Sequence, residues 1–73
     1  MILKDGLAGS SYTVKQIDLP LSLERRLEAL GMTEGTQISV LGRKNHGAMI
    51  IKIRGTRFAV GYGITSHIAV SAA

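Results

Sequence analysis

Residues 26–36 read RLEALGMTEGT, and this stretch decides the fold because the spacing of the apolar residues changes across it. Leu23, Leu27 and Leu30 recur at i, i+4 and i+7, the spacing of one face of a helix. Gly31 follows the last leucine, where a helix end favours a residue that adopts the left-handed conformation. Beyond the stretch, apolar residues alternate with a period of two, which is typical of β-strands. The sequence therefore predicts a short helix joined to a run of strands.

The ends of this helix can be predicted from its flanking residues. Ser22 stands before the periodic leucines and is the residue type that caps a helix N-terminus. At the other end we expect the helix to stop at Leu30, with Met32 packing back against it as in a Schellman-type end.

Strand-forming residues predict five strands, of which four lie after the helix. In the first, Tyr12 and Val14 share an inward face and Ile17 is out of phase, which predicts either a bulge or the end of the strand near Gln16. The predicted strands are residues 12–17, 37–41, 48–53, 57–60 and 68–70.

The segments between these strands contain turn-forming residues. Arg54 and Gly55 have the length of a two-residue hairpin turn, with Gly55 at positive φ. Residues 42–47 read as a polar, basic loop, and residues 64–66 as a single helical turn. At the start of the chain, residues 1–3 and Leu7 are expected to form a short arm that packs on the strands.

Length and composition favour one small, mainly β domain spanning residues 1–73. A chain of 73 residues buries only about 60% of its unfolded surface, so its core is thin. Five short strands and one helix leave no second layer, and closing the sheet into a barrel removes its edges. An SH3-like barrel is the first choice for the fold, and an OB-like barrel is the second.

The sequence offers little for catalysis or for metal binding. His46 and His67 are the two histidines, and cysteine is absent, so we expect no metal site and no cofactor. The chain contains neither a nucleophile elbow nor a Walker A pattern, and we expect no enzymatic activity. The uncharged stretch 58–73 is 16 residues long, against about 20 for a membrane span. With no signal peptide and no disulfide framework, we expect a cytoplasmic protein.

The formal net charge is +4, and all residues after Glu34 that carry a formal charge are basic. Such a surface suits an acidic protein, a nucleic acid or an anionic membrane. The simpler interpretation is a solvated strand face whose cations prevent sheet edges from pairing. The residues concerned are Arg43, Lys44, Lys52, Arg54 and Arg57.

Nucleic-acid binding is the alternative function. Small barrels bind single strands through aromatic platforms set in a positive groove. Because alternation places Phe58 inward, Tyr12 and Tyr62 are left as the aromatic platforms, and the stacking surface is poor.

Several stretches together carry a resemblance over nearly the whole chain. The pattern R-L-x-x-L-G-M-x-x-G-T at residues 26–36, the alternating residues around Ile38 and Val40, and the segments 51–55, 58–60 and 68–70 resemble the FeoA family of bacterial ferrous iron transport. This resemblance implies an SH3-like, non-catalytic adaptor in the cytoplasm, acting on the cytosolic region of the iron permease that carries a GTPase domain.

Two groups of residues are our candidates for contact with such a partner. One lies at the predicted helix end and the other in the basic second half: Leu30, Met32, Arg43, Lys44, Arg54 and Arg57. For the first pair, the simpler alternative is ordinary core and cap packing. The sequence leaves open which part of the permease is bound, the direction of any effect on GTP hydrolysis, and self-association through a strand edge.

Overall fold

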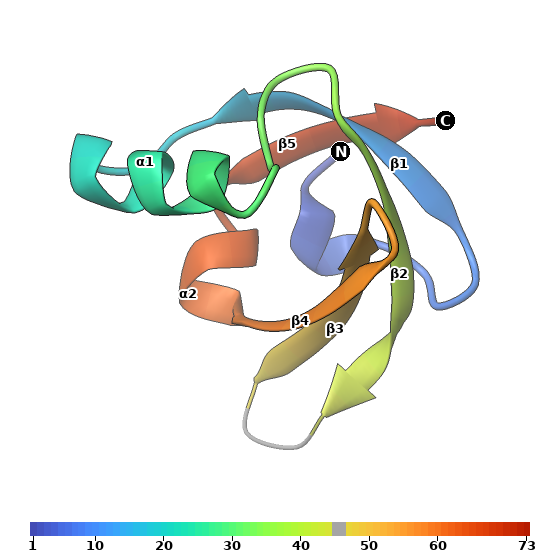
Figure 1. Ribbon diagram of the computed structural model, residues 1–73. Helices are drawn as coiled ribbons and strands as arrows, with labels where there is room; N and C mark the ends of the chain where they lie inside the picture. The colour runs from blue at the N-terminus through green and yellow to red at the C-terminus, as the bar shows by residue number, and fades with distance from the viewer. Residues whose placement is uncertain (45–46) are drawn as a thin grey trace.

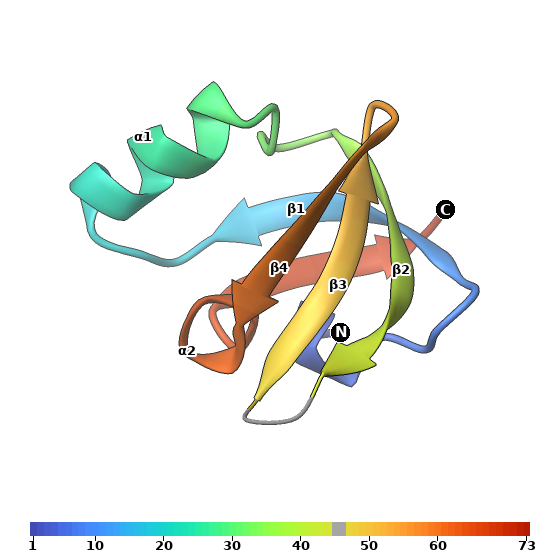
Figure 2. The same ribbon diagram turned by 60° about the horizontal axis from the view of Figure 1, so that its bottom comes forward.

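The computed structural model describes residues 1–44 and 47–73, which contain five β-strands, two α-helices and one short 3-10 helix (Figure 1). The sheet has the order β4-β3-β2-β1-β5, and all its neighbouring strands are antiparallel. It curves around the core, with α1 and α2 on the side of β4 (Figure 2). The elements are η1 (Leu3–Asp5), β1 (Ser11–Ile17), α1 (Leu21–Ala29), β2 (Gln37–Lys44), β3 (Ala48–Ile53), β4 (Thr56–Gly61), α2 (Tyr62–Thr65) and β5 (Ile68–Ala72). The prediction of a mainly β fold with five strands is confirmed.

Alternation along the strands builds the core as the sequence predicts. Each strand turns every second side chain inward, and the inward residues are mostly Ile, Val and Met. The N-terminal arm contributes Leu3, which is fully buried, whereas Leu7 is 67% exposed and does not pack as predicted. The buried apolar residues are Leu3, Tyr12, Val14, Leu27, Met32, Ile38, Val40, Met49, Ile51, Ile53, Val60, Ile68 and Val70.

Two bulges adjust the register of the sheet. The β1–β5 register shifts between Val14 and Gln16, so a bulge, rather than the end of the strand, accounts for the change of phase near Gln16. A second shift, between Val40 and Gly42 in β2, was not predicted and leaves Leu41 on the surface. Beyond it, β2 continues through Arg43 and Lys44, which pair with Met49 and Ala48. The expected basic loop is therefore shorter than predicted, because the bulge restores pairing with β3; Asn45 and His46 lie outside the described residues.

Helix α1 begins two residues earlier than predicted, at Leu21, and its last residue is Ala29, with the predicted end residue Leu30 as the C-cap. The carbonyl of Pro20, rather than a Ser22 side chain, accepts hydrogen bonds from the backbone N–H groups of Leu23 and Glu24, both at 3.0 Å. At the C-terminus, the Met32 N–H bonds to the Leu27 carbonyl at 2.9 Å, and the Gly31 N–H bonds to the Glu28 carbonyl at 2.9 Å. This is the Schellman pattern, with Gly31 at φ 96°.

The hairpin turn after β3 lies where it was predicted, and the helical turn after β4 begins earlier than predicted. Arg54 and Gly55 have φ values of 50° and 84°, so the β3–β4 hairpin closes through a type I′ turn. The helical turn predicted at residues 64–66 begins earlier, as α2, because Gly61 already serves as its N-cap.

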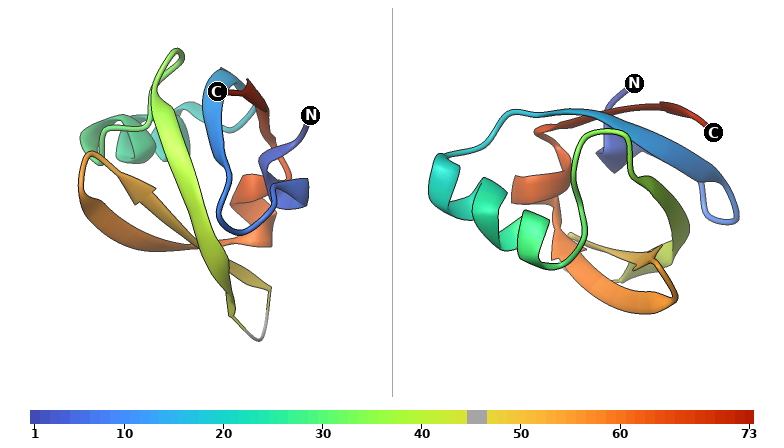
Figure 3. Two further views of the ribbon diagram at one scale, coloured as in Figure 1. Left: turned by 90° about the vertical axis from the view of Figure 1, so that its right-hand side faces the viewer. Right: turned by 45° about the horizontal axis from the view of Figure 1, so that its top comes forward.

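The two edges of the sheet are treated differently. The outer edge of β5 is covered by the N-terminal segment: Ile2 forms an antiparallel bridge with Ala69, and the Val70 N–H bonds to the Met1 carbonyl at 2.7 Å. Figure 3 (left) shows this segment beside β5. Within residues 1–44 and 47–73, β4 pairs with β3 alone. One edge of the sheet is thus closed and the other is open.

Candidate functional site

An apolar groove of about 420 Å³ lies between α1 and the outer strand β4. Helix α1 supplies one wall, and β4 together with Ile64 of α2 supplies the other. Arg26 is the one charged side chain in its lining. The lining residues are Leu23, Arg26, Leu27, Ala29, Leu30, Ala59, Val60, Gly61 and Ile64.

The helical wall of the groove follows from the period of the leucines. Leu27 points into the core and is 5% exposed, Leu23 is half-buried, and Leu30 is 45% exposed. Leu30 is also the C-cap residue, so the Schellman end at Gly31 fixes its position. The predicted contact residue Leu30 therefore lies on the surface and in the groove.

Met32 lies elsewhere. Its side chain is 1% exposed and belongs to the core cluster, so it is not on the surface where a partner would contact it. The packing alternative given by the sequence applies to this residue: Met32 stabilises the end of α1.

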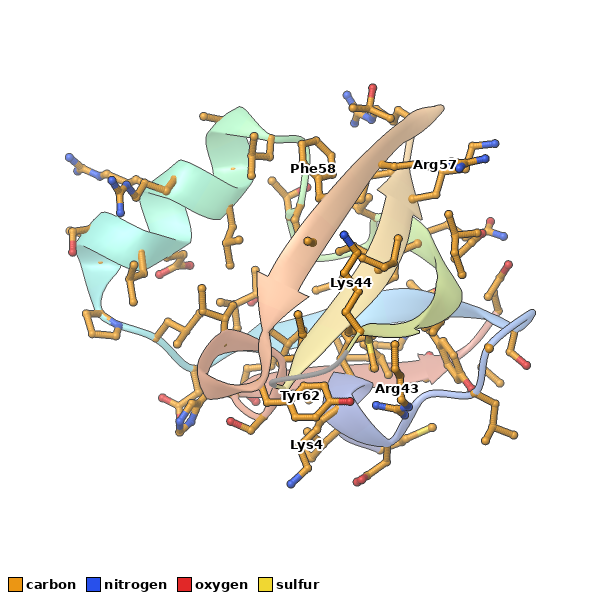
Figure 4. The ribbon with its side chains drawn as sticks, turned by 90° about the horizontal axis from the view of Figure 1, so that it is seen from below. Lys4, Arg43, Lys44, Arg57, Phe58 and Tyr62 are labelled. Atoms are coloured by element: carbon orange, nitrogen blue, oxygen red, sulfur yellow. The ribbon has the colours of Figure 1, made fainter. Side chains whose placement is uncertain are left out.

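The strand wall of the groove is built from small residues. Ala59 and Gly61 are exposed and carry little or no side chain, so the β4 backbone itself lines the groove. Phe58, between them and the hairpin, is half-buried and is directed toward α1, whereas Arg57 points to the other side of the strand (Figure 4). This wall was not predicted from the sequence, although small residues at alternate positions of an edge strand are the signal that marks it.

The guanidinium of Arg43, a predicted contact residue, is hydrogen-bonded within the fold. Its Nη1 donates to the Tyr62 hydroxyl oxygen at 2.9 Å and its Nη2 donates to the Gly6 carbonyl at 2.6 Å. The guanidinium carbon also lies 5.7 Å from the centre of the Tyr62 ring, within cation–π range. Figure 4 shows Arg43 beside Tyr62, with Lys4 and Lys44 nearby. Arg43 thus ties the N-terminal segment to α2, while Lys44 is exposed at the end of β2.

The basic residues of the β3–β4 hairpin form a second surface. Lys52 and Arg57 are cross-strand partners in this hairpin. Arg54 lies in the turn and, with Lys52, lines an open polar hollow that also contains Thr33 and Ser39. Like charges directly opposite one another in a sheet are mildly unfavourable, and an acidic partner would relieve them.

The aromatic residues give little support to single-strand binding. Tyr12 is 5% exposed and its hydroxyl accepts a hydrogen bond from the Leu7 N–H at 2.9 Å. The ring of Tyr62 is half-buried and engaged by Arg43. Neither tyrosine is presented as an open stacking platform.

Residue types that commonly ligate metals are dispersed in the part of the chain that the structure describes. His67 is exposed and lines a small crevice with Asp18 and Gln16. No group of three or more His, Cys, Asp or Glu side chains gathers within residues 1–44 and 47–73. Among the same residues, neither helix has the length and hydropathy that crossing a bilayer requires.

Comparison with known proteins identifies the family. Residues 1–72 match the FeoA domain family. The chain belongs to the FeoA family. A FeoA relative, the putative Fe(2+) transport protein A of Methanocaldococcus jannaschii, is 32% identical over 62 residues, covering 85% of this chain and 74% of that protein.

Solved FeoA structures confirm the SH3-like fold. A FeoA protein described as an iron uptake regulatory protein superimposes with a TM-score of 0.90 at 29% identity, covering 100% of this chain and 97% of that one. Stenotrophomonas maltophilia FeoA, solved with zinc and described as an SH3 domain protein, superimposes with a TM-score of 0.82 at 22% identity, covering 97% and 89%. The SH3-like barrel, rather than the OB-like alternative, is the fold of this FeoA-family chain.

Proposed function

We propose that this member of the FeoA family is a non-catalytic adaptor of ferrous iron transport that binds the cytosolic region of the GTPase-containing iron permease. Membership of a ferrous iron transport family supports the assignment of this chain to ferrous iron transport. The observation that carries the binding role is the apolar groove between α1 and β4, an unfilled surface on a domain whose own core is thin. A cytoplasmic location is part of this proposal.

The groove provides the apolar part of the proposed interface and the hairpin provides the charged part. Leu30 supplies exposed apolar area at the groove, and Arg54 and Arg57 lie on the hairpin that ends in β4. An apolar centre with a charged rim is the usual anatomy of a protein interface. The rim charges are expected to set the rate of association, and the groove is expected to set the rate of dissociation.

The test of the groove is the substitution Leu30→Gln. Burying the exposed 45% of this leucine contributes about 1 kcal/mol, so we expect a fivefold to tenfold weaker affinity for the purified cytosolic region of the permease. Leu21→Gln is the matched control, because Leu21 is 60% exposed on the same helix and does not line the groove. Equal affinities of the two variants, measured by calorimetry, would remove the groove from the interface.

The test of the rim is the double substitution Arg54→Glu with Arg57→Glu. Both residues are exposed, so folding should be nearly unchanged, within about 0.5 kcal/mol per site. Association with the permease region should become slower and lose its dependence on salt. Lys4→Glu with Lys15→Glu makes the same change in net charge at two other exposed positions and should leave most of the rate intact. Wild-type rates in the hairpin variant, at low and high salt, would show that these arginines are only solvated surface.

The nucleic-acid alternative has its own test. We expect weak RNA binding that is indifferent to sequence and disappears as salt rises. Submicromolar affinity for a particular RNA sequence at physiological salt would overturn the adaptor function.

A further inference from the structure

The outer edge of β4 presents backbone groups in an alternating pattern. The type I′ turn at Arg54 and Gly55 is closed by the pair Ile53 and Thr56, so this pair exchanges hydrogen bonds. Because hydrogen-bonded and non-bonded pairs alternate in an antiparallel ladder, the next bonded pairs contain Phe58 and Val60. The alternate residues of β4 belong to the non-bonded pairs, so they direct their N–H and C=O groups away from β3; these residues are Arg57, Ala59 and Gly61. Of these, Ala59 and Gly61 line the groove.

This edge lacks the covering that the opposite edge has. The N-terminal segment bonds to β5 through Met1 and Ile2, whereas in the described residues β4 has no neighbour beyond β3. Natural proteins cover or shorten strand edges because free N–H and C=O groups are a template for another strand. An edge left open beside an apolar groove is therefore a place where a strand can be added.

The shape of the groove suits an extended chain more than a helix. One wall is a strand whose small residues, Ala59 and Gly61, expose the backbone, and the other is the leucine face of α1. A strand laid along β4 would turn alternate side chains toward Leu23 and Leu30 and the others toward solvent. Backbone pairing would supply affinity and the alternate apolar side chains would supply specificity, as in β-augmentation.

Charge decides the composition of that strand. Arg26 is the one charged residue of the lining, and Arg57 lies on the same strand edge with Lys52 opposite it. All three are cations, and the lining contains no acidic residue. An incoming segment with carboxylates at its solvent-facing or flanking positions matches this arrangement.

We propose that the groove binds an extended segment of a partner, with alternating apolar and acidic residues, which adds to the sheet as a strand beside β4. The proposal rests on the proposed function in taking the segment to belong to the cytosolic region of the permease. It assigns the backbone of Arg57, Ala59 and Gly61 as the pairing groups, and Leu23 and Leu30 as the contacts for side chains.

Amide hydrogen exchange measured by NMR tests this pairing directly. In the free protein, the amides of Arg57 and Ala59 should exchange fast, and those of Phe58 and Val60 slowly. With the purified cytosolic region of the permease at saturation, exchange at Arg57 and Ala59 should slow at least tenfold, while Phe58 and Val60 change little. An apolar contact without strand pairing would not produce this alternation.

A substitution provides the second test. Ala59→Pro removes the outward N–H, and proline is tolerated on an edge strand where the N–H faces away from the sheet. We expect affinity to fall at least tenfold. Ala59→Ser is the matched control, because it keeps the N–H and nearly the same size. If Ala59→Pro fails to fold, the exchange pattern of the unmodified protein decides.

Each outcome separates the inference from the proposed function. Binding of the permease region without slower exchange at Arg57 and Ala59 would overturn strand addition and leave the adaptor function standing.

If the permease region does not bind, the adaptor function fails, and a ten-residue peptide of alternating valine and glutamate becomes the probe. Protection of the two amides by that peptide, but not by its valine–lysine counterpart, supports the inference; no protection overturns it. Protection that appears as the protein alone is concentrated would show that two β4 edges pair with each other, and would also overturn it.

Discussion

Substituting Gly31 by alanine tests whether the left-handed end of α1 stabilises the fold. Gly31 has φ 96°, and a Cβ there would meet the Cγ2 atom of Ile53 at 3.5 Å, an ordinary contact, so the cost is conformational. Holding alanine in a left-handed conformation costs about 1–2 kcal/mol. Lower entropy of the unfolded chain offsets about 0.4–1 kcal/mol of that cost. The expected net destabilisation is therefore about 1 kcal/mol.

For a domain of this size, such a loss lowers the melting temperature by about 4–8 °C, which calorimetry measures readily. Gly31→Asn should lose less, because asparagine tolerates the left-handed region. Gly63→Ala is the control: Gly63 lies in α2 without a positive φ and with no atom within 4 Å of its Cβ position, so alanine should stabilise by about 0.5–1 kcal/mol. If Gly31→Ala and Gly63→Ala shift stability in the same direction, the requirement for a left-handed residue at the helix end is refuted.

Three further predictions concern a buried hydroxyl group, a hydrogen-bonded arginine and a cross-strand pair of cations. Thr65 is fully buried and its hydroxyl has no hydrogen-bond partner in the structure, so Thr65→Val should be neutral or stabilise by up to about 1 kcal/mol in urea unfolding; a loss above about 1 kcal/mol would reveal an unseen partner. Tyr62→Phe removes the acceptor for Arg43 and should lower the free energy of unfolding by about 0.5–1.5 kcal/mol. The same substitution made in the Arg43→Met variant should lower it by less than in the wild-type protein. Full additivity in this double-mutant cycle would show that the two side chains are not coupled. Arg57→Glu places opposite charges across the sheet from Lys52 and should stabilise by about 0.2–0.5 kcal/mol at low salt, and an unchanged midpoint would show that the pair does not interact.

Local patterns predicted those parts of the fold that depend on neighbouring residues. The Schellman end at Gly31 and the two-residue hairpin turn at Gly55 were predicted, and a bulge was one of two alternatives near Gln16, because each leaves a mark within a few residues of sequence. Strand ends were less accurate. The extension of β2 to Lys44 depends on a second bulge and on pairing with β3, and neither leaves a periodic signal.

The candidate site was only half visible in the sequence. The leucine period placed Leu30 at a helix end, but nothing local indicated that α1 would lie across from β4, so the wall formed by Ala59 and Gly61 was missed. The positive charge of Arg43 was a poor guide to partner contact for the same reason. Arg43 reads as a surface cation in sequence, whereas its donors reach a carbonyl 37 positions away in the chain at Gly6. Long-range approach, rather than residue type, decides whether such an arginine is free.

The pairing of β5 with β1, and of Ala69 with Ile2, has a consequence for how the protein is made. The first strand of the sheet has its outer neighbour at the far end of the chain, so those contacts cannot form until residue 72 has left the ribosome. Residues 37–61 can form the meander of β2, β3 and β4 earlier, because their pairings are local. Until then the edge of β1 that pairs with β5 stays unpaired, and the sheet is completed in a late step. During that interval a chaperone, or a second nascent copy, has its best opportunity to bind.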